Sequence, residues 1–142
     1  MTTAYGVTNS TAATLKVIPS GSAYAAEILA AGTGFFWEFN ETNATTAFDY
    51  VGSANGTNVS ITYGNPGPQP GGFAGMDSNN LAYTFNGSSS EVRLPSSLSL
   101  NLSAFSIVAW IRSGTASPYQ SIMAQGGSLW CFHLNGTAQI WS

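Results

Sequence analysis

The sequence predicts an all-β protein with one short helix near its N-terminus. Charged residues make up only 6% of the chain, against about 25% in an ordinary soluble domain. The hydrophobic fraction is nevertheless 44% and the aromatic fraction 13%, whereas disordered segments have few aromatic residues. Short stretches of alternating apolar and polar residues, bounded by Gly, Pro and Asn, are typical of antiparallel strands. The composition therefore predicts a packed β fold with uncharged polar loops, as is more usual on extracellular surfaces than in cytosol.

Two strands are predicted on either side of a serine-rich turn. Apolar residues alternate over residues 81–85 and again over residues 91–94, where Pro95 ends the pattern. Asn86-Gly87 begins the turn between them. We expect these two strands to lie side by side as an antiparallel hairpin.

The strongest buried-strand pattern covers residues 105–111. One face carries only apolar residues, and the other is made partly apolar by Val108 and Trp110. A strand that is apolar on both faces is usually central and covered by a second layer. We therefore expect this segment inside a two-sheet sandwich, with Trp110 and Trp37 in the core.

Shorter elements fill the rest of the chain. A helix is predicted after Ser20, because Ser22 can cap its start, Ala-rich residues continue it and Gly32 can end it; Tyr24, Ile28 and Leu29 form its apolar stripe. Strands are predicted over residues 13–18, 35–39, 59–63, 121–124, 129–134 and 138–141, with a surface loop over 65–75. Asn135-Gly136 predicts a tight hairpin turn between the last two strands.

Several classes of partner are excluded by composition. Lys16, Arg93 and Arg112 are the only cations and the net charge is −3, whereas binding to nucleic acid normally uses several Lys or Arg against phosphates. No apolar run is long enough for a transmembrane helix. The first residues lack the pattern of a signal peptide, so an export signal would lie outside this segment. Cys131 is the only cysteine, so an internal disulfide cannot form.

Four motifs follow one another from about Phe35 to Gly127: FFWEFNET with TTAFDYVGSANGT, then LAYTFNGSSSEVRLP, LSLNLSAFSIVAWIR and SIMAQGG. In this order they resemble the laminin G-like, concanavalin A-like jelly-roll domain of secreted bacterial proteins. The resemblance implies two antiparallel sheets packed as a curved sandwich. Such a domain normally continues for several more strands, so we expect an incomplete jelly roll that is marginal or prone to aggregate, because unpaired strand edges would stay open.

Residues 2–19 resemble the last hairpin of a bacterial immunoglobulin-like repeat. We therefore expect three parts: the terminal strands of a preceding immunoglobulin-like module over 1–19, a short linker helix over 20–33, and a partial laminin G-like domain over 34–142.

Candidate chemistry is sparse. Glycosidases need two acids facing one bond, roughly 5 to 9 Å apart, but Glu38 and Glu41 are three residues apart and would point to opposite faces of a strand. Glu91 stands alone on its hairpin, and Asp49 and Asp77 lie in predicted loops. We expect structural or solvated carboxylates and no catalytic residue.

Two places could hold a metal ion. Asp49 and Asn55 lie in a loop rich in oxygen atoms, and calcium takes six to eight oxygen ligands; the resemblance adds weight, since related jelly rolls often carry a structural calcium. A single carboxylate is a thin ligand set, and Asp also favours turns for its own backbone hydrogen bonds. Cys131 and His133 are two residues apart on one predicted strand, but a structural zinc site needs four ligands. We therefore expect these two side chains to be ordinary core or surface residues.

Exposed aromatic rings can stack on sugar rings, and the candidates are Trp130, Trp141, Tyr119 and Tyr63. We expect a non-catalytic module that binds carbohydrate or a protein surface outside a bacterial cell, alongside other modules of a larger chain. A structural spacer is the alternative. A glycoside hydrolase fragment is a third, and it would need a carboxylate pair in strands beyond this sequence.

Overall fold

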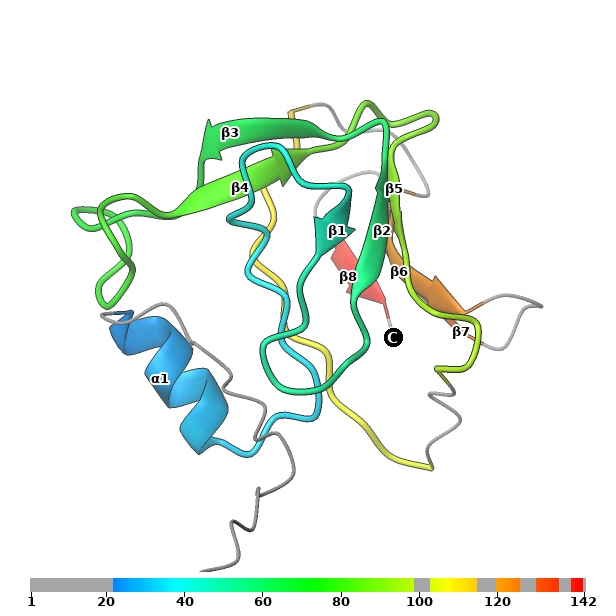
Figure 1. Cartoon of the computed structure of the whole chain (residues 1–142), viewed down its shortest axis with the longest axis horizontal. Helices are drawn as coiled ribbons and strands as arrows, with labels where there is room; N and C mark the ends of the chain where they lie inside the picture. Colours follow the sequence, from blue (N-terminus) through cyan, green and yellow to red (C-terminus); the bar gives the residue numbers. More distant parts are fainter. Residues whose placement is uncertain (1–21, 99–102, 115–119, 126–129, 136–138, 142) are drawn as a thin grey trace, which may run out of the picture.

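The computed structural model describes residues 22–98, 103–114, 120–125, 130–135 and 139–141. In this part of the chain the protein is mostly strands with one helix, and every strand pairing is antiparallel (Figure 1). The β-rich class that the sequence predicts is therefore confirmed. The elements are α1 (Ala23–Ala30), β1 (Thr46–Ala47), β2 (Gly56–Val59), β3 (Thr62–Pro66), β4 (Leu81–Thr84), β5 (Glu91–Arg93), β6 (Gln120–Gln125), β7 (Trp130–Asn135) and β8 (Gln139–Trp141).

Helix α1 forms where the sequence predicts it. Ser22 caps the first turn, because its side-chain oxygen accepts a hydrogen bond from the Ala25 amide at 3.0 Å. Gly32 follows the helix at φ +74°, the left-handed conformation that glycine adopts without a steric penalty. Ala25 is fully buried, and the Tyr24 amide donates to the Gly75 carbonyl at 3.0 Å. The helix is thus attached to the long loop between β3 and β4.

The main feature of the fold is a bent two-stranded ribbon made of two pairs in separate sheets. β2 runs antiparallel to β5, and β3 runs antiparallel to β4. The ribbon bends at Ser60, which has φ 52°. β1 adds a third strand beside β2. The predicted hairpin between residues 81–85 and 91–94 is therefore wrong: both strands exist, but each pairs with a strand from residues 56–66.

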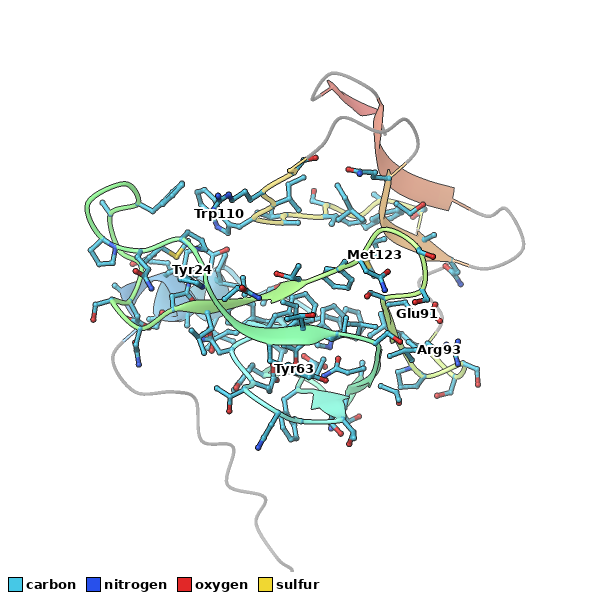
Figure 2. All side chains as sticks on the ribbon, turned by 90° about the horizontal axis from the view of Figure 1, so that it is seen from above. Tyr24, Tyr63, Glu91, Arg93, Trp110 and Met123 are labelled. Atoms are coloured by element: carbon cyan, nitrogen blue, oxygen red, sulfur yellow. The ribbon has the colours of Figure 1, made fainter. Side chains whose placement is uncertain are left out.

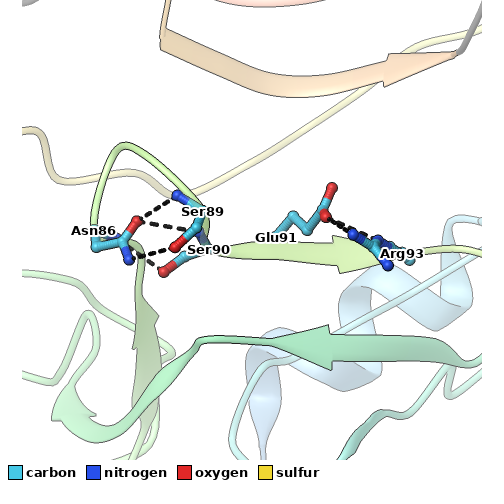
Figure 3. Close-up of polar contacts among 5 residues, drawn as sticks. All are labelled: Asn86, Ser89, Ser90, Glu91 and Arg93. Atoms are coloured by element: carbon cyan, nitrogen blue, oxygen red, sulfur yellow. Dashed lines mark hydrogen bonds and ion pairs between the residues drawn. The ribbon is translucent and has the colours of Figure 1, made fainter.

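A side-chain network holds the residues that were expected to be a hairpin turn. Between Val59↔Glu91 and Thr62↔Thr84, the ribbon leaves six residues on one side facing two on the other. Asn86 organises this excursion, because its Oδ1 accepts from the amides of Ser88, Ser89 and Ser90 at 2.9 to 3.0 Å; Figure 3 shows the bonds to Ser89 and Ser90. Ser90 Oγ then donates to the Ser60 carbonyl at 2.6 Å, tying the excursion to the bend.

Replacing Asn86 is expected to show that this oxygen matters. Asn86→Ala should lower the free energy of unfolding by about 1 kcal/mol, as loss of a helix N-cap does. The three exposed amides would lose this acceptor and would have to hydrogen-bond to water instead. Asn86→Asp keeps an oxygen in the same place and should stay close to wild type. Urea unfolding of both variants measures the difference. An aspartate variant as unstable as the alanine variant would contradict this role.

The tryptophan-bearing segment differs most from the prediction. Residues 105–111 form no strand, and Phe105, Val108, Trp110 and Ile111 are all exposed. The expected central strand and the expected core position of Trp110 are therefore wrong. The physical reason is that no strand in the described ranges pairs with this segment, although its apolar residues alone would suit a sandwich interior.

Some of the shorter predicted strands are confirmed and others are not. The last three predicted strands are confirmed as the sheet β6-β7-β8, and β7 pairs with β8 on either side of the predicted Asn135-Gly136 turn. Residues 35–39 hold only a single bridge, from Trp37 to Asp49. The predicted strand over 59–63 is split by the Ser60 bend into β2 and β3. The first two residues of the predicted loop over 65–75 lie in β3. The strand predicted over 13–18 lies outside the described residues.

The buried apolar side chains of the described residues are few. They lie in α1, in β1 and the segments on either side of it, in the β3–β4 loop and in β4: Ala25, Phe36, Ala47, Ala54, Met76 and Tyr83. Polar contacts and close backbone packing must therefore supply much of the cohesion. Gly56 shows how tight this packing is, because a Cβ at this position would collide with the side chain of Val92 on the neighbouring strand.

Candidate functional site

The Asp49 carboxylate is the centre of the loop between β1 and β2. Asp49 is 3% exposed. Oδ1 accepts from the amides of Phe36 and Val51, at 3.1 and 3.0 Å. Oδ2 accepts from the amides of Gly52 and Ala54, at 2.9 and 3.1 Å. One carboxylate thus joins the aromatic segment near Phe36 to the loop that follows Asp49.

The environment of Asp49 favours its charged form. Burial alone would raise its pKa, but the four backbone donors outweigh burial and hold the pKa below its ordinary value of 3.8. Gly52 is required for the close approach, since a Cβ there would lie 2.6 Å from Asp49 Oδ2.

The calcium interpretation of Asp49 and Asn55 stays a prediction, and the geometry gives these oxygens another role. Each Asp49 oxygen already has two N–H donors, and Asn55 Oδ1 accepts from the Asp49 amide at 2.9 Å. Amide hydrogens directed at these oxygens occupy the positions in which calcium would need to bind. Among the described residues, no group of three or more His, Cys, Asp or Glu side chains gathers in a way that would hold a metal ion.

A second polar cluster joins Glu41 to Tyr83 of β4. The Tyr83 hydroxyl donates to Glu41 Oε2 at 2.6 Å, and Glu41 Oε1 accepts from the Phe48 amide at 2.9 Å. Asn58 Nδ2 donates to the Tyr83 hydroxyl at 2.9 Å and to the Ala44 carbonyl at 3.0 Å. Burial, followed by the hydrogen bond to Glu41, raises the pKa of Tyr83 well above its ordinary value. Both Glu41 oxygens are therefore engaged by protein donors.

The surroundings of Glu38 differ from those of Glu41. Burial raises the pKa of Glu38, as do the charges of Asp77 and Glu41, while a hydrogen bond from Asn40 lowers it. The predicted placement of Glu38 and Glu41 on opposite faces of a strand is wrong, since neither lies in a strand. Glu91 pairs with Arg93 on the exposed face of β5 (Figure 3).

An aromatic patch is built from three segments that are far apart in sequence. We give this name to Tyr24 of α1, Phe73 of the β3–β4 loop and Trp110. The Trp110 ring meets Phe73 edge-on at 5.1 Å and Tyr24 at 6.3 Å, and Figure 2 shows Trp110 and Tyr24 close together. Trp110 is 53% exposed and Phe73 42%. Tyr24 also contacts buried Phe36 at 6.3 Å, so the patch is fixed to the core while its outer rings face solvent.

A small open pocket lies at the Asp49 loop. It encloses about 280 Å³, and its lining consists of Phe35, Gly52, Ser53, Ala54, Pro95, Ser97 and Leu98. The Phe35 ring is stacked on Trp37 at 5.7 Å, and Trp37 Nε1 donates to the Ala54 carbonyl at 3.0 Å. The Asp49 hydrogen bonds and this stack therefore shape one wall of the pocket.

Of the four predicted sugar-stacking residues, only Tyr63 has a described side chain. Tyr63 is half-buried, meets Tyr83 edge-on at 5.2 Å and donates a hydrogen bond from its hydroxyl to the Ala44 carbonyl at 2.7 Å. Its ring and hydroxyl therefore make contacts within the protein. Trp130 and Trp141 lie in β7 and β8, and their side chains, like those of Cys131 and His133, are outside the description. Tyr119 lies outside the described residues.

The chain matches none of the family models, curated proteins or solved structures with which it was compared. Within the described ranges, no helix is both long and apolar enough to cross a membrane.

Proposed function

We propose that this chain is a non-catalytic binding module that recognises carbohydrate through the aromatic patch, as part of a larger bacterial protein outside the cell. The observation that carries the proposal is the exposure of two large rings, Trp110 and Phe73, held at fixed angles by each other and by Tyr24. Aromatic faces pack well against the apolar face of a pyranose. Large exposed apolar patches mark interaction sites in soluble proteins.

The composition supports the same proposal. The chain is rich in uncharged polar residues, and only 6% of its residues are charged. A neutral ligand with many hydroxyl groups suits such a surface better than a nucleic acid, which would need several cations. A laminin G-like jelly roll remains our hypothesis for the finer fold, and the order of the sequence motifs supports it. The binding proposal stands on the aromatic patch and does not depend on that fold.

A glycan array with the wild-type chain tests the proposal, using soluble cell-wall and plant polysaccharides as ligands. Trp110→Ala and Phe73→Ala should each weaken binding by about tenfold or more, because aromatic anchors at the centre of an interface dominate its binding free energy. Phe48→Ala is the matched control, since Phe48 is 46% exposed and makes no ring contact with the aromatic patch. Its affinity should be unchanged.

Two results would overturn the carbohydrate assignment. One is a wild-type chain that binds no glycan. The other is equal loss of binding in Phe48→Ala and Trp110→Ala, which would point to non-specific apolar adhesion. Capture of one defined surface protein, lost only in the aromatic-patch variants, would transfer the proposal to a protein ligand.

A further inference from the structure

Residues 106–112 have an open backbone. The chain from Phe105 to Ser113 contains no helix, turn or bend, and Figure 1 shows it as a long open trace. Among the described residues, none is hydrogen-bonded through the backbone to residues 106–112. Val108 is 78% exposed and Ile111 47%. Residues 106–112 therefore offer amide and carbonyl groups with which another strand can pair.

The side chains specify what kind of strand can pair here. Residues 105–111 are rich in β-branched and aromatic residues and contain no charge and no proline, which is the composition of segments that pair strongly. A charged partner strand would have to place its charges against these apolar side chains. The partner must therefore be extended, neutral and apolar, and the segment itself meets all three requirements.

We propose that this segment pairs with the same segment of a second copy of the chain, antiparallel and centred on Val108. An antiparallel pair of identical strands is symmetric, so one contact serves both copies. In this register Ile107 lies opposite Ala109 on one face and Val108 lies opposite its own copy on the other, so apolar side chains meet on both faces of the pair. Arg112 falls at opposite ends of the pair, whereas a parallel in-register pair would place the two Arg112 cations side by side.

Cysteine cross-linking tests the register. In a Cys131→Ser background, Val108→Cys would bring two thiols together on the two-fold axis, within the Cα separation of about 4.4 to 6.8 Å that a disulfide needs. The matched control is Ser106→Cys, also exposed. Its two copies would be offset by four residues, roughly 14 Å along the strands, and should not cross-link directly. Under mild oxidation, the Val108→Cys dimer should form at least about tenfold faster.

The outcomes are distinct. Equal cross-linking of the two variants would overturn the antiparallel register, and a wild-type chain that sediments as a monomer at every concentration would overturn self-association. Val108→Pro removes a backbone donor in the centre of the pair and should sediment as a monomer with an unchanged circular dichroism spectrum. Because Trp110 and Phe73 are intact in Val108→Pro, retained glycan binding in that variant would separate this inference from the proposed function.

Discussion

Asp49→Ala is expected to lower the free energy of unfolding by about 3–5 kcal/mol, more than any other substitution proposed for this chain. Four backbone amides lose their acceptor at once, and those of Phe36 and Ala54 are in buried hydrogen bonds. A buried donor left without a partner costs about 1–3 kcal/mol. Urea unfolding followed by tryptophan fluorescence measures the change.

Asp77→Ala is the matched control for Asp49. Asp77 is the same residue type in a loop, and no described group is hydrogen-bonded to its carboxylate. Its replacement should change stability by less than about 0.5 kcal/mol. If both variants lost the same amount, the amide contacts of Asp49 would not be the source of its contribution.

The pH dependence of stability gives an independent test of Asp49. Because its pKa is held below 3.8 in the folded protein, its contribution is fully present above pH 3.8 and is lost as the pH falls through the folded pKa. Wild type should therefore lose stability more steeply below that pH than Asp49→Asn, which cannot titrate. Parallel pH profiles for the two proteins would contradict this assignment.

Local signals in the sequence were sufficient for the elements that depend on neighbouring residues. The Ser22 cap and Gly32 lie within one turn of the helix they delimit, so α1 could be predicted from the sequence. The same holds for β7 and β8, which are neighbours in sequence and pair with each other. The Asp49 loop had a signal of this local kind, namely an Asp with a Gly three residues later, but four amide donors on one carboxylate depend on backbone folding that spacing does not specify.

Pairing between distant segments could not be predicted in the same way. Alternation located β4 and β5 correctly, yet it says nothing about which partner each strand takes, and Asn86 turned out to hold an excursion instead of a hairpin turn. Residues 105–111 carry the pattern of a central strand, but periodicity alone does not distinguish a covered strand from an exposed one. The hydrogen bond from Tyr83 to Glu41 joins residues 42 positions apart, so no local sequence motif could predict it.

Tyr83→Phe is expected to lower the free energy of unfolding by about 1.5–3 kcal/mol, the range for a hydrogen bond to a charged group. The ring remains, so its stacking on Phe39 at 4.8 Å is preserved, and the loss comes from the hydroxyl that links Glu41 to Asn58. Tyr24→Phe, whose hydroxyl has no hydrogen-bond partner among the described residues, should match wild type. Urea unfolding of both variants measures the difference.

The pKa of Tyr83 makes this prediction testable at alkaline pH as well. Burial and the bond to Glu41 raise the folded pKa above the ordinary value of 10.0, so the contribution of Tyr83 is fully present below pH 10.0 and is lost as the pH rises toward the folded value. Tyr83→Phe should therefore be less sensitive than wild type to alkaline pH. A double-mutant cycle with Glu41→Ala adds the decisive comparison, because a direct bond predicts strongly non-additive losses. Additive losses would mean that Tyr83 and Glu41 stabilise the loop independently.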